Sequence, residues 1–173
     1  MPLTHSEKLF QKLFIPHKHS IVILQMNIIW CCKAFNSLTP VELYSILQLR
    51  NEVFVVEQNC VYQDCDDKDR QSYHFMGWQQ NKLVAYTRLL PPGIAFEEIS
   101  IGRVVTSPSI RGNKIGRELM IRSIEKLHEL FGKSKIKIGA QLYLKSFYES
   151  LGFTKCSDVY LEDDIEHIKM LRN

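Results

Sequence analysis

The feature that most restricts how this chain can fold is a strand-like run that leads through a short loop into an amphipathic helix. Residues 97–106 are rich in Ile and Val, which favour a strand, and Ser107-Pro108 ends it. Apolar residues at helical spacing then follow, namely Ile115, Leu119, Met120, Ile124, Leu127 and Phe131. Gly132 is placed to end this helix, so the sequence predicts a strand, a loop and a helix in direct succession.

Further elements are predicted on both sides of this unit. Residues 28–35 are expected to form a strand. Thr39-Pro40-Val41-Glu42 is a strong helix start, with a capping threonine, a proline at the first helical position and a glutamate that closes a capping box. Residues 59–70 are polar and lack periodicity, which favours a long loop. The other predicted elements are strands at 73–79, 83–90, 135–140, 153–160 and 167–172 and a short helix at 144–150.

The order of these elements is strand, helix, three strands, helix, strand, helix and two strands. It predicts an α/β or α+β fold in which a mixed sheet is packed against helices in one domain, residues 28–173. Residues 1–27 have a different pattern, with short apolar pieces separated by Lys and His. They are interpreted as an N-terminal extension.

The composition is that of an ordinary globular protein, with 45% apolar residues, 24% charged residues and a net charge of +3. This small charge argues against a nucleic-acid partner, and no apolar run approaches the roughly 20 residues of a membrane span. The five cysteines include no C-x-x-C pair, so neither a disulfide framework nor a metal site is expected. We therefore expect a cytosolic protein with free thiols.

The loop between the predicted strand and helix carries the candidate chemistry. Arg111, Gly112, Lys114, Gly116 and Arg117 gather where the helix begins. The first turn of a helix presents backbone N–H groups that have no partner inside the helix, and the helix dipole and nearby cations add to their attraction for a phosphate. The loop is neither a Walker motif nor the dinucleotide fingerprint. Taken alone, it is equally consistent with two glycines that only shape a turn.

Arg111 to Gly116 resembles the R-x-x-G-x-G/A loop of the GNAT superfamily of acetyl-coenzyme-A-dependent N-acetyltransferases, with Lys114 where the family usually has glycine. Residues 139–153 resemble the family's later A-x-x-x-x-x-x-F-Y-x-x-x-G-F segment. Further stretches are similar to the ElaA-like branch, namely Leu49–Gln58, Tyr62–Asp64, Gly77-Trp78, Ala85–Arg88 and His167–Met170. Three separated motifs in the right order are more specific than any one of them.

This resemblance implies a mixed, mostly antiparallel central sheet of about seven strands flanked by helices, acetyl-CoA as cosubstrate and no metal. It implies that the loop amides hold the diphosphate and that the pantetheine arm lies like an added strand along the preceding strand. The residues it assigns to the cosubstrate are Arg103, Val104, Val105, Thr106, Arg111, Gly112, Asn113, Lys114, Ile115, Gly116 and Arg117. The amide of Val104 or Val105 would stabilise the oxyanion as an amine attacks.

The resemblance also suggests catalytic residues. Tyr148 matches the family's usual general acid, and the ordinary tyrosine pKa of about 10 keeps it protonated at neutral pH. Glu57 is the first candidate for the base that deprotonates the amine, with His74 and His167 behind it. Each has a structural alternative: an aromatic packed in the core for Tyr148, a turn cap for Glu57 and a hydrogen-bonded strand residue for either histidine.

The acceptor stays open between small-molecule amines and peptide or protein amines. Arg50 and Arg88 either bind an acidic group of the acceptor or form ion pairs with the Asp64–Asp69 loop. The sequence indicates neither a nucleic-acid nor a membrane partner, and it leaves the oligomeric state open, a homodimer included. A second hypothesis keeps the coenzyme A site for sensing without turnover, and the departure at Lys114 slightly favours it.

Overall fold

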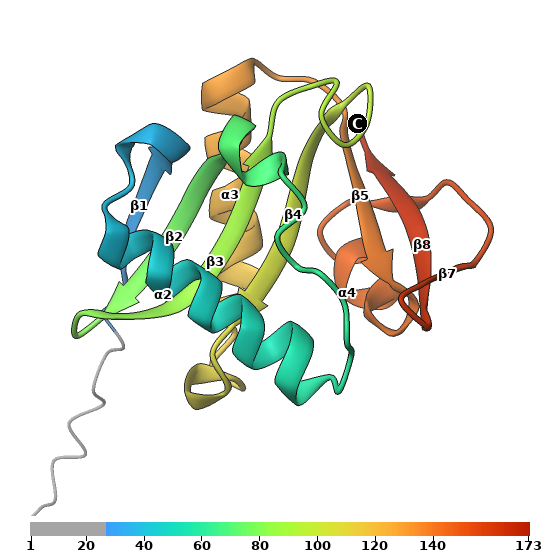
Figure 1. The fold of residues 1–173 in the computed structure, drawn as a ribbon. Coiled ribbons are helices and arrows are strands. Elements are labelled where there is room, and N and C mark those ends of the chain that lie inside the picture. Colours follow the sequence, from blue (N-terminus) through green and yellow to red (C-terminus); the bar gives the residue numbers. More distant parts are fainter. Residues whose placement is uncertain (1–26) are drawn as a thin grey trace, which may run out of the picture.

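The computed structural model describes residues 27–173, so the proposed N-terminal extension lies, but for its last residue, outside the described part. Eight strands form one sheet in the order β1-β2-β3-β4-β5-β8-β6, with β7 paired to β8 (Figure 1). The strands are β1 Ile29–Ala34, β2 Tyr73–Gln79, β3 Lys82–Leu90, β4 Ile99–Thr106, β5 Ile136–Gln141, β6 Thr154–Lys155, β7 Tyr160–Glu162 and β8 Ile165–Arg172. The helices are α2 Pro40–Arg50, α3 Ile115–Phe131 and α4 Lys145–Glu149. Only β4 and β5 pair in parallel, which confirms the mixed, mostly antiparallel sheet.

The sheet separates two layers of helix, because successive side chains of a strand point to opposite faces. Tyr86 of β3 packs with Ile46 and Leu49 of α2, which crosses the front of the sheet in Figure 1. The next residue, Thr87, points to the other face, where its hydroxyl group lies 2.7 Å from that of Ser123 in α3. The larger apolar core lies on this α3 face.

The predicted helix ends are confirmed where capping chemistry fixed them. The Glu42 N–H donates to the Thr39 hydroxyl at 3.2 Å and the Thr39 N–H donates to the Glu42 carboxylate at 2.8 Å, which completes the capping box. Helix α3 ends before Gly132, as predicted, and the φ of 82° at this residue favours glycine.

Other boundaries differ from the prediction. The helical face expected to run as far as Phe54 is present, but beyond Arg50 the helix continues in π-helical geometry, as η2 Asn51–Glu57. The strand predicted at 153–160 is two separate strands, β6 and β7, and β8 begins at Ile165 rather than His167. The turn between β7 and β8 consists of Asp163 and Asp164, which both have positive φ values, 50° and 62°. Such turns favour Asn or Asp followed by Gly, and here the glycine is missing from the sequence.

The two central strands diverge, and this divergence positions the site. β4 pairs with β5 only at Ile99–Ile136 and Ser100–Lys137, after which the two strands separate (Figure 1). A β-bulge places both Arg103 and Val104 of β4 opposite the single residue Thr87 of β3. The rest of β4 therefore has a free edge on the side that faces β5.

Candidate active site

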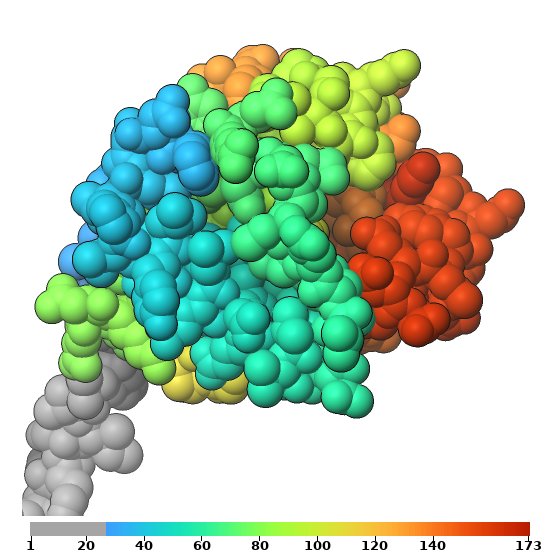
Figure 2. All heavy atoms as spheres, viewed as in Figure 1, coloured from blue at the N-terminus to red at the C-terminus, as the bar shows by residue number. Residues whose placement is uncertain are grey.

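Two cavities lie along the gap between β4 and β5. The first has a volume of about 540 Å³, the second of about 330 Å³, and both are within or near the range of small-ligand sites. Figure 2 shows the surface hollowed between the loop that follows η2 and the β7–β8 hairpin. The residues that line both cavities are Phe54, Gln58, Val104, Gln141, Leu144 and Tyr148. This shared set marks where a ligand in one cavity meets a ligand in the other.

The loop before α3 exposes a row of backbone donors. No acceptor within residues 27–173 takes a hydrogen bond from the N–H groups of residues 112–116. The chain turns here with positive φ at Gly112 (83°) and at Lys114 (61°). A methyl group placed on Gly112 or Gly116 would meet no atom within 4 Å. The loop is therefore an open cradle of N–H donors at the positive end of a helix dipole, which favours an anion.

Three side chains predicted at this loop are held by protein partners. Arg111 donates to both carboxylate oxygens of Glu57, at 2.6 and 2.9 Å. Arg117 donates to the Ser150 hydroxyl at 2.8 Å and so ties α3 to the end of α4. The Asn113 amide donates to the Ile110 carbonyl at 3.1 Å. Only Arg111 among these three also lines the second cavity.

The residues predicted on β4 divide between the cavities. Val104 lines both, Val105 and Thr106 line the second, and Arg103 lines the first. Arg103 has a left-handed φ of 51°, and its guanidinium group donates to Asp64 at 2.7 Å. The bulge thus turns the Arg103 side chain to the loop of residues 59–72 and leaves Val104 between the cavities.

Tyr148 lies where the two cavities meet, although its side chain is almost buried. It is 5% exposed and packs edge-on against Phe147 and Phe153, with ring centroids 5.1 and 6.0 Å apart. Burial raises the pKa of the Tyr148 hydroxyl well above its ordinary value, since the phenolate would lose its water. The group is therefore protonated at neutral pH.

The three candidate bases have very different surroundings. His74 is fully buried and lies in neither cavity; its Nδ1 is 2.8 Å from the Tyr86 hydroxyl and its Nε2 is 3.1 Å from the Asp69 carbonyl. These are the surroundings of the structural alternative given for His74, a hydrogen-bonded strand residue. The ion pair with Arg111 lowers the pKa of Glu57, which makes its carboxylate a weaker base.

His167 lies in the first cavity. Its Nδ1 is 2.8 Å from the Ile165 carbonyl, so Nδ1 donates and Nε2 keeps a lone pair in the neutral ring. In the β5–β8 register it stands opposite Gln141, a residue of the shared lining. Of the three candidates, His167 has the geometry of a base.

The arginines outside the loop belong to an ion-pair network, as one of the two interpretations predicts. Arg50, which is fully buried, donates to Asp64 at 2.7 Å and to Asp69 at 2.8 Å. Arg88 donates to Asp66 at 2.6 Å and to Asp69 at 2.9 Å. Together with Arg103, three arginines thus neutralise three aspartates. Within the described residues no cluster of His, Cys, Asp or Glu is arranged to hold a metal ion.

Several lining residues escaped the sequence analysis. They are Phe54, Gln58, Gln141, Lys68 and Lys169 and the acidic tip of the β7–β8 hairpin, Glu162 and Asp163. No local pattern identifies them, because they reach the cavity from η2, a long loop and two antiparallel strands. Phe54, Gln58 and Lys169 lie in stretches that resemble the ElaA-like branch, and Gln141 lies in the segment of residues 139–153.

The fold and this divided cavity define a class of protein. A family model described as an acetyltransferase (GNAT) domain matches residues 38–172, and the chain belongs to that GNAT acetyltransferase family. Among curated proteins it is similar to protein ElaA of Escherichia coli K12, at 43% identity over 139 residues, 79% of this chain and 91% of ElaA. A UPF0039 protein of Schizosaccharomyces pombe is 45% identical over 146 residues, 83% of this chain and 96% of its own length.

Solved structures agree with these relatives. An acyl-CoA N-acyltransferase from Pseudomonas aeruginosa is 43% identical, with a TM-score of 0.82 over 85% of this chain and 100% of that chain. The E. coli ElaA crystal structure is 41% identical, with a TM-score of 0.80 over the same shares. Separately, none of the helices in the described part of the chain is long and apolar enough to cross a membrane.

Proposed function

We propose that the chain is an N-acetyltransferase that moves an acetyl group from acetyl-CoA to a primary amine by direct attack in a ternary complex. The observation that carries this proposal is the meeting of two cavities at Val104 and Tyr148. One cavity is bordered by the loop of unpartnered N–H groups, and the other is lined by His167.

The residues fit the cosubstrate. The N–H groups of residues 112–116 offer donors for a diphosphate, and Gly116 leaves its surroundings open. The free edge of β4 offers main-chain groups to an extended ligand, in the manner of an added strand. When bound, acetyl-CoA would supply an acetyl group activated as a thioester. Arg111 would exchange its partner Glu57 for a phosphate oxygen.

Three residues of the chain would then act in sequence. His167 would accept, through Nε2 or a bound water, the proton that a primary amine must lose before it attacks. The Val104 N–H would donate to the oxygen on which negative charge develops. Tyr148, kept protonated by burial, would donate its proton to the departing sulfur, because coenzyme A leaves more readily as a neutral thiol than as a thiolate anion.

The experiment is the release of free thiol from acetyl-CoA in the presence of a panel of amines. We expect turnover with at least one amine, and we expect Tyr148→Phe to slow it without changing the affinity for coenzyme A. Tight binding of coenzyme A with no turnover on any amine would overturn the proposal and favour a sensing role.

A further inference from the structure

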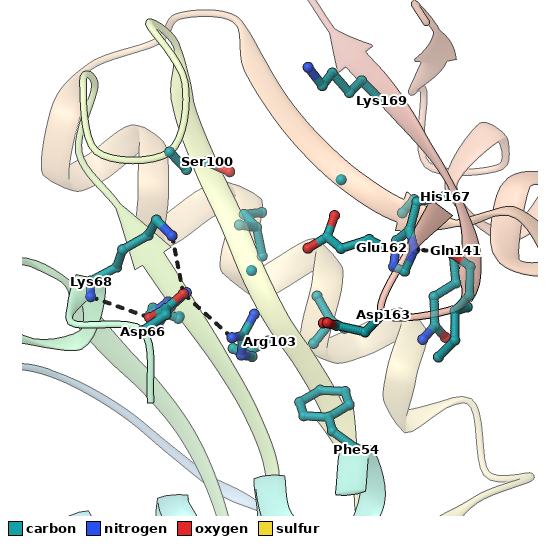
Figure 3. A pocket seen from close by; sticks show the side chains of 18 of the residues that line it. Phe54, Asp66, Lys68, Ser100, Arg103, Gln141, Glu162, Asp163, His167 and Lys169 are labelled. Atoms are coloured by element: carbon teal, nitrogen blue, oxygen red, sulfur yellow. Dashed lines mark hydrogen bonds and ion pairs between the residues drawn. The ribbon is translucent and has the colours of Figure 1, made fainter. Parts of the chain in front are cut away.

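The first cavity carries opposite charges at its two ends. Figure 3 shows Lys169, Lys68 and Ser100 around one end, and Asp163 beside Phe54 at the other, with Glu162 between them on the hairpin wall. Phe54 also lines the second cavity, so the acidic end is the one nearer to the meeting point with the cosubstrate. The basic end is the more distant one.

The charges of the three arginines in the ion-pair network are already balanced, so they do not cause the difference in charge between the two ends of the cavity. Arg50, Arg88 and Arg103 are matched by Asp64, Asp66 and Asp69. Two lysines remain at the basic end. Lys68 lies 3.3 Å from Asp66, a carboxylate that Arg88 already holds at 2.6 Å. Lys169 meets only the rings of Phe96 and Tyr160, at 6.0 and 5.9 Å, and no carboxylate within residues 27–173.

The acidic end is held in place by the fold. Glu162 and Asp163 are exposed, and neither forms an ion pair with a cation in the described part of the chain. The Asp163 carbonyl accepts from the Cys60 thiol at 3.5 Å, which fastens the hairpin tip to the loop after η2. Two carboxylates therefore stand near His167 without a cationic partner in the described part of the chain, where an ammonium group would bind.

From this polarity we infer that the acceptor is a small amphoteric molecule, an amine that also carries a carboxylate, as an amino acid does. Its ammonium group binds beside Glu162 and Asp163, close to His167 and the acetyl donor. Its carboxylate binds at the basic end, between Lys169 and Lys68, with the Ser100 hydroxyl as a further donor. A polyamine would instead place a second positive charge against two lysines. The inference rests on the proposed function, because it names the acceptor for that same site.

The test compares amines that differ only by a carboxylate: L-lysine with 1,5-diaminopentane, and glycine with methylamine. Calorimetric titration into protein saturated with free coenzyme A measures binding without turnover, and thiol release measures kcat/KM. We expect the carboxylated member of at least one pair to be preferred about tenfold, the scale of one charge-assisted hydrogen bond. Equal binding of both members in every pair, or a preference for the members without carboxylate, would overturn the inference.

A charge reversal sharpens the test. Lys169→Glu should reverse the preference between L-lysine and 1,5-diaminopentane and leave the affinity for coenzyme A unchanged. Lys155→Glu, an exposed lysine of β6 that lines neither cavity, is the matched control and should keep the wild-type preference. An unchanged preference in Lys169→Glu would overturn the inference. If the wild-type protein shows the binding preference but transfers no acetyl group to any amine, the proposed function alone is overturned.

Discussion

The carboxylate of Glu57 and the guanidinium group of Arg111 form a two-point ion pair, with N–O distances of 2.6 and 2.9 Å. The pair joins the end of η2 to the loop that precedes α3. It lowers the pKa of Glu57, and it engages the same Arg111 nitrogens that a phosphate would use. Glu57 therefore has the position of an internal competitor for the diphosphate rather than that of a base.

Replacing Glu57 separates these two roles. We expect Glu57→Gln to raise the affinity for coenzyme A by a few-fold, because Arg111 is then released, and to leave kcat within about twofold. Both residues are about 40% exposed, so solvent screening keeps the effect small. Titration calorimetry and steady-state kinetics measure the two quantities. A collapse of kcat with unchanged affinity would restore Glu57 as the base.

Alanine substitutions at Gly116 and Gly112 together test whether the loop binds coenzyme A. Gly116 lies in the first turn of α3 with open space around it, so Gly116→Ala should stabilise the fold by about 0.5 kcal/mol. The same substitution should weaken coenzyme A binding, because the added methyl group obstructs the loop amides. Gly112 has a φ of 83°, so Gly112→Ala should destabilise the fold by roughly 1–2 kcal/mol. Thermal unfolding with and without coenzyme A separates stability from binding. A Gly116→Ala variant with unchanged affinity would contradict the assignment of this loop.

His167→Gln should lower kcat/KM by about 10²–10⁴-fold, the usual contribution of a general base, and should leave coenzyme A binding unchanged. His74→Gln should instead lower the melting temperature, since it removes two buried hydrogen bonds. An unchanged kcat/KM in His167→Gln would show that another group is the base.

The ion-pair network predicts a loss of stability in acid. Burial alone would raise the pKa of Asp66, but its ion pairs with Arg88, Arg103 and Lys68 outweigh burial, and the pKa is lowered in the folded state. Such a group stabilises the fold above its unfolded pKa of about 3.9, and this contribution is lost as the pH falls towards the folded value. We therefore expect a stability plateau above about pH 5 and a decline below it.

Asp66→Asn tests the network against a close neighbour. It should reduce the free energy of unfolding by roughly 2 kcal/mol at pH 7 and flatten the decline towards pH 3, because a partly buried charge partner is removed. Asp67→Asn is the control. Asp67 has a 90% exposed side chain and a positive φ that Asn also tolerates, so we expect a change below about 0.5 kcal/mol. Urea denaturation across this pH range measures both, and equal effects would contradict the network's role.

The sequence predicts the fold where local chemistry dictates it. The capping box at Thr39 and Glu42 and the glycine stop at Gly132 both appear in the structure. The π-helical continuation after Arg50 was not predicted, since its apolar spacing is also that of an ordinary helix. The type of the Asp163-Asp164 turn was not predicted either. Both residues have positive φ values, and the sequence contains no glycine there that would indicate such angles.

In the candidate site, too, the features that are contiguous in sequence were predicted, and those that depend on the fold were not. Its anion loop is contiguous in sequence, and the ring partners of Tyr148 lie in one short motif, so both were accessible to sequence reasoning. The surroundings of the candidate bases could not be predicted, because burial depends on the fold: His74 is enclosed by the sheet and the Asp69 loop, while His167 faces a gap that exists only because β4 and β5 diverge. Spacing along the chain does not encode that divergence.

The N–H cradle of residues 112–116 is the feature on which the other assignments depend. Calorimetric titration of the wild-type protein with coenzyme A, and separately with pantetheine, which lacks the diphosphate, examines it without any acceptor or turnover. We predict saturable one-site binding of coenzyme A in the micromolar range and binding of pantetheine at least about 100-fold weaker, because the diphosphate makes several charge-assisted hydrogen bonds. No heat with coenzyme A at millimolar concentration, or equal affinities for the two compounds, would contradict it.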